Sequence, residues 1–192
     1  GVSLEGRKKI IAAIRESMLE HAEELARHAH RETGLGRVED KVIKNRLVTR
    51  KTSGTEVLTP HAVTGDDGLT LTEYAPYGVI GAITPTTNPP STIICNTIAM
   101  LAAGNSVVFN VHPNARECSM ANIRLLHRAI VGAGGPDVDY RLTALVHQRP
   151  AKDGGLVAAI DGSGRVVFRD NRGETDSVPA RDVFRKAVPW TR

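Results

Sequence analysis

Aromatic side chains, cysteines and long apolar runs are all scarce in this 192-residue chain. Phenylalanine, tyrosine and tryptophan together make up 4% of the residues, which argues against a surface that stacks the bases of single-stranded nucleic acid. The longest apolar stretch, Ile93 to Ala103, is too short to cross a bilayer and is interrupted by Asn96. No charged segment followed by an apolar one opens the chain, so we expect no secretory signal, no membrane partner and a cytoplasmic protein.

The chain has only two cysteines, Cys95 and Cys118, which are too few for a disulfide framework and favour a reducing compartment. Cys95 falls within an apolar segment, where we expect a buried and inert thiol. Cys118 falls in the first turn of an expected helix, where the positive end of the helix dipole favours a thiolate. His28 and His30 would point to different faces of a helix, so we predict no metal site.

Positive charge is concentrated toward the end of the sequence. Residues 1–140 hold 15 Lys and Arg against 15 Asp and Glu, whereas residues 141–192 hold 10 against 6, which accounts for the whole net charge of +4. We therefore predict a domain boundary at residues 137–141. The arginines of the last segment indicate a solvated surface, and a nucleic-acid patch, whose binding would weaken steeply with salt, is the less favoured alternative.

Three periodic segments precede Tyr77. Apolar residues recur at helical spacing from Leu4 to His30, which predicts one long amphipathic helix with Ser3 as its N-cap and Gly34 after its end. Residues 34–54 then read as a turn, a charged helix and a second turn. The segment from Leu69 to Tyr74 alternates apolar and polar residues, which predicts a half-buried strand.

The middle of the chain alternates apolar strand and helix patterns. The expected elements are a strand at Tyr77 to Ile83 buried on both faces, a buried helix at Ser91 to Ala103, a second buried strand at Ser106 to Val111 and a helix at Ala115 to Val131. This order predicts an α/β fold with a parallel sheet. Because ligands of such sheets bind beyond the carboxyl ends of the strands, the candidate site is formed by the loops at residues 84–91 and 110–115.

These two loops carry the candidate functional side chains. The first contains three threonines, three prolines and Asn88, and its stiffness suits a fixed amide donor to an oxyanion. The alternative is that its Asn-Pro and Pro-Pro pairs are only turn-forming. The second loop carries Asn110 and His112, which suit the ribose hydroxyls of a dinucleotide, although His112 and Pro113 also suit a structural turn.

Four stretches that precede the predicted boundary carry a resemblance, and several of them are long, ungapped and unusual. They are ETGLGRVEDKVIKN (32–45), KTSGTE (51–56), TGDDGLTLTEYAPYGVIGAITPTTNPPSTIICNTIAMLAAGNSVVF (64–109) and HPNA (112–115). Together they resemble the N-terminal part of the CoA-acylating aldehyde dehydrogenases, the propionaldehyde and acetaldehyde type of bacterial microcompartments. Residues 1–31 fit the helix that precedes this stretch in the family, so the resemblance extends from Gly1 to about Asp137.

The resemblance implies a partial NAD-binding domain over residues 1–137 of an enzyme that converts a small aldehyde, CoA and NAD into acyl-CoA and NADH. In that family a cysteine thiolate attacks the aldehyde, hydride passes to the nicotinamide and CoA resolves the thioester. The family's oxyanion-binding asparagine matches Asn88. The wall beside the nicotinamide matches Thr84, Pro85, Thr86 and Thr87. The positions that face the adenosine ribose match Asn110 and His112.

The chain also departs from the family pattern. The family's nucleophilic cysteine lies beyond the region of resemblance and matches neither cysteine here, so the chain is expected to be inactive in isolation. The alternative is a non-catalytic subunit that binds an intact dehydrogenase, a microcompartment component or a second copy of itself. Residues 138–192 do not resemble the family. Their pattern predicts a β-hairpin at 156–170, with its turn at residues 161–164, and a short helix at 177–188. This segment is either a fused module or a sequence never selected for this fold.

Overall fold

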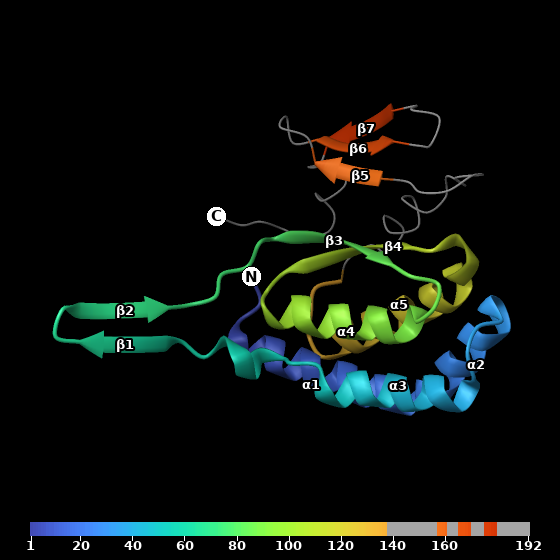
Figure 1. Ribbon diagram of the computed structural model, residues 1–192, viewed down its shortest axis with the longest axis horizontal. Helices are drawn as coiled ribbons and strands as arrows, with labels where there is room; N and C mark the ends of the chain where they lie inside the picture. Colours follow the sequence, from blue (N-terminus) through green and yellow to red (C-terminus); the bar gives the residue numbers. More distant parts are fainter. Residues whose placement is uncertain (138–156, 161–164, 170–174, 180–192) are drawn as a thin grey trace. The chain divides into compact units, whose positions relative to one another are not determined.

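The computed structural model describes residues 1–137, 157–160, 165–169 and 175–179. The chain divides into two compact units, Gly1–Gly135 and Pro136–Arg192. In chain order the elements of the first unit are α1 (Leu4–Glu20), α2 (Ala22–Thr33), α3 (Val38–Lys51), η1 (Thr55–Leu58), β1 (His61–Gly65), β2 (Gly68–Thr72), β3 (Val79–Thr84), α4 (Pro89–Ala102), β4 (Ser106–Val111), η2 (Pro113–Ala115) and α5 (Arg116–Gly132) (Figure 1).

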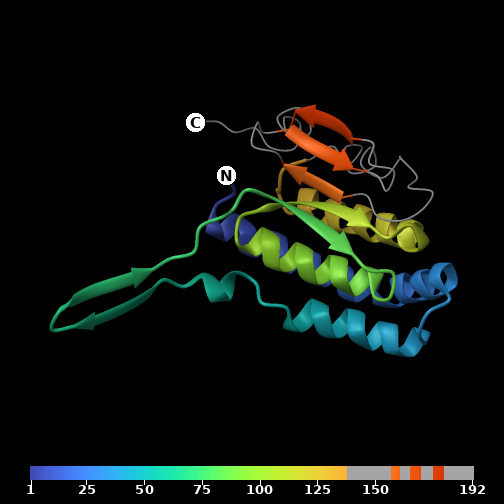
Figure 2. The same ribbon diagram turned by 45° about the horizontal axis from the view of Figure 1, so that its top comes forward.

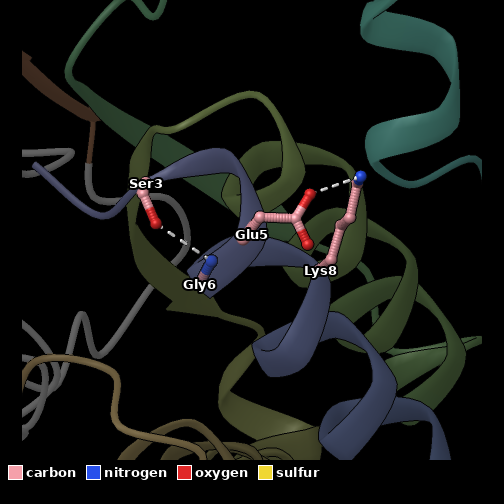
Figure 3. Close-up of polar contacts among 4 residues, drawn as sticks. All are labelled: Ser3, Glu5, Gly6 and Lys8. Atoms are coloured by element: carbon pink, nitrogen blue, oxygen red, sulfur yellow. Dashed lines mark hydrogen bonds and ion pairs between the residues drawn. The ribbon is translucent and has the colours of Figure 1, made fainter.

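Helix α1 begins with the N-cap that the sequence predicts. The hydroxyl of Ser3 accepts a hydrogen bond from the backbone N–H of Gly6 at 3.1 Å. In the first turns of the helix, Glu5 and Lys8 form an exposed ion pair at 2.7 Å (Figure 3). Through its hydrogen bond to Gly6, the side-chain oxygen of Ser3 satisfies one of the N–H groups that the first turn of a helix leaves without a partner.

The expectation of a single helix from Leu4 to His30 is wrong, because the helix is interrupted at His21. The backbone of His21 has φ −92° and ψ 9°, and its Nδ1 lies 2.8 Å from the carbonyl oxygen of Ser17. The stripe of buried apolar residues continues into α2, so periodicity gave no sign of the break. Helix α2 ends as predicted at Gly34, whose φ of 67° is a conformation that glycine adopts without strain.

Strands β3 and β4 form a parallel pair, which confirms the predicted α/β class. Helix α4 packs against both strands, α5 contacts α4 and α1, and α1 to α3 form the layer beyond them (Figures 1 and 2). The largest fully buried apolar side chains lie between these layers: Ile14, Met18, Leu25, Ile93, Ile94 and Ile98. Within the described part of the chain, none of the helices has the length and apolar character needed to cross a membrane.

The expectation that the first strand of this pair is buried on both faces is wrong. Ala82 and Thr84 are buried, whereas the alternate residues Gly81 and Ile83 are exposed, Ile83 by 75%. Helix α4 covers one face of the strand, and successive side chains of a strand point to opposite faces. Helix α4 begins at Pro89, two residues before the predicted start, because proline is well suited to the first turn of a helix.

Strands β1 and β2 form an antiparallel hairpin. The strand expected at Leu69 to Tyr74 is confirmed over residues 69–72 as part of β2. The expectation that it is half-buried is wrong, since every residue of both strands is exposed. Strand β1 was not predicted. The hairpin extends away from the helices of its unit, so neither of its faces has a layer to pack against (Figures 1 and 2).

The second unit contains an antiparallel sheet in the order β5 (Val157–Ile160), β6 (Arg165–Arg169) and β7 (Thr175–Pro179). The predicted pairing of the first two strands is confirmed, and their turn at 161–164 lies outside the described residues. The helix expected at 177–188 is wrong at its start, because residues 177–179 belong to β7 and pair with β6. The rest of that predicted helix lies outside the described residues.

Candidate functional site at the carboxyl edge of the parallel strands

The two candidate loops leave the same edge of the parallel sheet. The register pairs Thr84 with Val111 and Ile83 with Asn110, so the strands end side by side. The segment that contains Asn88 and the segment that contains His112 therefore follow from adjacent strand ends. This is the edge at which open parallel sheets bind their ligands.

The alternation of the strands separates two of the predicted site residues. Thr84 is only 3% exposed on the face that α4 covers, and its Oγ1 has no hydrogen-bond partner among the described residues. Asn110 pairs with the exposed Ile83 and lies on the opposite face. Beyond the strand, Pro85 and Thr87 are exposed and Thr86 is half-buried, so the loop itself is the accessible part of this segment.

The backbone of Asn88 is fixed at the start of α4. Its carbonyl oxygen accepts hydrogen bonds from the backbone N–H of Thr92 at 3.1 Å and from the hydroxyl of Ser91 at 3.3 Å. Its side chain makes no capping hydrogen bond, although asparagine at this position commonly caps a helix. Instead, Oδ1 accepts from Nζ of Lys44 at 2.6 Å and Nδ2 donates to Oγ1 of Thr87 at 3.3 Å.

Helix α3 also holds the loop through Lys41, whose Nζ donates to the carbonyl oxygen of Thr87 at 3.1 Å. Lys41 is only 8% exposed, and burial, together with the nearby charge of Lys44, lowers the pKa of its ammonium group. Lys41, Asn45 and Thr49 are spaced by four residues and form the buried side of α3. Neither lysine was predicted, because a polar stripe at helical spacing ordinarily indicates the solvent-facing side of a helix, whereas in α3 the apolar Ile43 and Leu47 are the exposed residues.

His112 takes part in a local turn. Its Nδ1 accepts a hydrogen bond from the backbone N–H of Asn114 at 3.1 Å, at the start of η2. This hydrogen bond supports the structural-turn interpretation. It also fixes the tautomer of the neutral ring, with the proton on Nε2, which is the nitrogen able to donate to a ligand hydroxyl.

The N-termini of the two helices at this edge are closed to phosphate groups. Helix α4 starts with Pro89 and Pro90, which have no N–H. At α5, the carboxylate of Glu32 accepts from the backbone N–H of Glu117 at 2.8 Å and of Cys118 at 2.7 Å. Burial raises the pKa of Glu32, but these two hydrogen bonds, together with the Cys118 thiol and the charge of His28, outweigh it and leave the pKa below its ordinary value. The side chains of Asn88, Asn110 and His112 can hydrogen-bond to ribose hydroxyls or to amide groups of a ligand. The two helix N-termini are not available to bind a pyrophosphate.

Neither cysteine lies in the two candidate loops. The Cys118 thiol is buried and donates to the carbonyl oxygen of Ala115 at 3.4 Å. Burial, with the adjacent Glu32, raises its pKa to about 12, so the expectation of a favoured thiolate is wrong. Cys95 is half-buried, not buried as expected. In the described part of the chain, no three His, Cys, Asp or Glu side chains gather where a metal could bind.

The family profile of the aldehyde dehydrogenases matches residues 1–139. The chain is 56% identical over 129 residues to the acetylating acetaldehyde dehydrogenase of Bilophila wadsworthia, which covers 67% of this chain and 27% of the relative. It is 49% identical over 123 residues to the CoA-propanoylating propanal dehydrogenase of Citrobacter freundii, which covers 64% and 27%.

Solved structures of the same type are also similar. A propionaldehyde dehydrogenase from the fucose-utilisation microcompartment of Clostridium phytofermentans superposes with a TM-score of 0.66 at 57% identity, over 70% of this chain and 31% of that one. The Rhodopseudomonas palustris propionaldehyde dehydrogenase with bound propionyl-CoA gives 0.67 at 52% identity, over 70% and 30%. The chain thus spans less than a third of these relatives. From the family match and these identities, the chain belongs to the aldehyde dehydrogenase family.

Proposed function

We propose that this chain supplies the oxyanion donor and part of the NAD-binding surface of a CoA-acylating aldehyde dehydrogenase. The observation that carries the proposal is the amide of Asn88, which lies beyond the end of β3 and is not used to cap α4. An amide N–H held at that place can stabilise the negative charge that develops on an aldehyde oxygen during attack by a thiolate. The high identity to acetylating and propanoylating relatives supports the same reaction class.

The NAD-binding surface is proposed to consist of Pro85, Thr86 and Thr87 together with Asn110 and His112, because Thr84 is buried beneath α4. NAD supplies the hydride acceptor in this reaction class. The Nε2 of His112 is suited to donate to a ribose hydroxyl, because its Nδ1 is already an acceptor. The pyrophosphate needs donors from outside these two loops, since Pro89, Pro90 and Glu32 close the helix N-termini. The surface in this chain is therefore part of a dinucleotide site.

The chain by itself is proposed not to form acyl-CoA. Formation of the thioester needs a thiolate, and the raised pKa of Cys118 keeps that buried group protonated at neutral pH. Cys95 lies within α4 and in neither candidate loop. Asn88 is then an oxyanion donor without a nucleophile from this chain.

Two measurements test the proposal. Purified chain is incubated with propanal, NAD and CoA, with the full-length propanal dehydrogenase of Citrobacter freundii as the positive control; no acyl-CoA is expected, and its formation would overturn the proposed inactivity. In a separate experiment, NAD is titrated into ¹⁵N-labelled chain. The backbone signals of Asn110 and His112 are expected to shift, while those of the distant β1–β2 hairpin stay in place. Unmoved signals at Asn110 and His112 would contradict the proposed NAD surface.

A second candidate is a non-catalytic subunit that binds an intact dehydrogenase, a microcompartment component or a second copy of this chain. It is favoured by large apolar side chains that the described residues leave exposed: Val63, Leu69, Leu71, Tyr74, Tyr77 and Ile83. Its test is co-purification with a full-length relative. A stable complex supports this candidate, and a chain that stays monomeric and unbound contradicts it. For either candidate the proposed location is the cytoplasm, in association with a microcompartment.

A further inference from the structure

The direction of the Asn88 amide matters for the proposed reaction. A carboxamide carries an acceptor oxygen and a donor nitrogen of nearly equal size, and only the nitrogen can stabilise an oxyanion. An ammonium group has three donors and no acceptor, so it can hydrogen-bond only to the oxygen of the amide. Nζ of Lys44 lies 2.6 Å from Oδ1 of Asn88.

We propose that Lys44 is a positioning residue whose ammonium group holds Oδ1 of Asn88, so that the amide nitrogen is the end presented at the carboxyl edge of the sheet. This inference rests on the proposed role of Asn88 as the oxyanion donor. The side chain of Lys44 is exposed on α3. Its contact with Asn88 links α3 to the start of α4, two elements that are far apart in the sequence.

The contact has an electronic consequence as well as a geometric one. A cation at the oxygen of an amide draws electron density from the nitrogen and makes its N–H groups stronger donors. One proton of Nδ2 is directed to Oγ1 of Thr87, at the long distance of 3.3 Å. The amide group has two such protons, so Nδ2 can donate to a substrate oxygen while Oδ1 remains held by Lys44.

The residue before Asn88 is held from the same helix. Nζ of Lys41 donates to the carbonyl oxygen of Thr87 at 3.1 Å, and Lys41 and Lys44 are three residues apart, on one side of α3. The chain after Asn88 is fixed by Pro89 and Pro90 and by the hydrogen bonds to its carbonyl oxygen. With the backbone fixed on both sides, the remaining freedom of Asn88 is the rotation of its side chain, which Lys44 restrains.

The test is a spectroscopic measurement on the intact chain. The side-chain NH₂ signals of Asn88 are assigned in a ¹⁵N-labelled sample from their loss in Asn88→Ala. Lys44→Met keeps the apolar part of the side chain and removes the ammonium group. We expect an upfield shift of the Nδ2 resonance, since the nitrogen regains electron density, and faster interchange of its two protons. Lys44→Arg, which retains a cationic donor, is expected to restore both properties.

Lys51→Met is the matched control, because it makes the same change on an exposed lysine at the end of α3. Unchanged Asn88 signals in Lys44→Met, or an equal change in Lys51→Met, would overturn the proposal. A dispersed amide spectrum and an unchanged melting temperature show that each variant is folded. If Lys44→Met is unfolded, Lys44→Ala, which also has no donor, replaces it, and the same two outcomes decide.

This readout requires neither NAD nor catalysis, so it separates the inference from the function on which it rests. If Asn88 responds to Lys44 but NAD leaves Asn110 and His112 unmoved, the positioning contact stands and the NAD surface is contradicted. If NAD moves those signals but Asn88 is indifferent to Lys44, the NAD surface stands and the positioning role is overturned.

Discussion

Glu32 caps a helix that begins far later in the sequence, with its Oε2 2.7 Å from the backbone nitrogen of Cys118. Its other oxygen accepts from the backbone N–H of Glu117. One carboxylate thus satisfies two free donors of α5 and places a negative charge at the positive end of the helix dipole. The same contact lowers the pKa of Glu32, contributes to the raised pKa of Cys118 and closes this helix end to a phosphate.

Replacement of this carboxylate should destabilise the first unit. Glu32→Gln keeps the shape but removes the charge and leaves one acceptor oxygen, so we expect the free energy of unfolding to fall by about 1 kcal/mol. Glu24→Gln, an exposed change on the same helix, is the control and should stay within about 0.5 kcal/mol of the original chain. Urea unfolding followed by circular dichroism measures both. Equal stability of the two variants would contradict the capping role.

The stabilisation by Glu32 should depend on pH in one direction. Its folded-state pKa is below the ordinary value of 4.5, so the unfolded chain takes up the proton first as the pH falls. The contribution is fully present above about pH 4.5 and is lost as the pH drops through the folded-state pKa. The difference in unfolding free energy between the original chain and Glu32→Gln should therefore shrink on acidification. A difference that stays constant would show that charge is not its cause.

The two thiols should differ in reactivity. Cys118 is buried with a pKa of about 12, so a thiol reagent such as DTNB should reach it only after unfolding. Cys95 is half-buried and should react in the folded chain. We expect one reactive thiol in the native chain, none in Cys95→Ser and one in Cys118→Ala, and two in denaturant for the unaltered chain. Rapid native labelling of Cys95→Ser would contradict the burial of Cys118.

The sequence was sufficient where the local pattern and the tertiary environment agree. The apolar run before Pro85, the apolar helix that ends before Gly104 and the second strand at Ser106–Val111 all lie within two residues of the bounds that periodicity predicts. Glycine at 104 has a φ of 85°, a conformation in which other residues are strained. The parallel pairing followed from the order of these elements, and with it the edge that carries Asn88, Asn110 and His112.

The sequence was insufficient where contacts join distant segments or where packing is one-sided. Lys44 meets Asn88 across 44 residues, and Glu32 meets Cys118 across 86, so no local spacing could indicate either pair. The apolar residues of β2 alternate like those of a half-buried strand, yet no layer of this unit covers them. Alternation reports that a strand has an apolar face; it does not report what covers that face.

The exposed apolar face of the hairpin can be tested without disturbing the fold. Leu69 and Leu71 lie on the same side of β2 and are 67% and 58% exposed. Replacing both with serine should change the free energy of unfolding by less than about 1 kcal/mol, because neither side chain is packed and no cavity is left. Sedimentation velocity should show less self-association, or less binding to a full-length relative, if this face contacts a partner.

Val57→Ser is the control for this prediction, because Val57 is an exposed apolar residue on η1 and lies outside the hairpin. It should leave association unchanged. If the double variant and Val57→Ser behave alike, the association does not involve the hairpin face and the interaction-subunit candidate loses its structural support. If the double variant unfolds, Leu69 and Leu71 are packed in solution and do not form a free apolar surface. Unchanged stability with weaker association is the outcome expected when a partner, and not the chain's own core, covers these side chains.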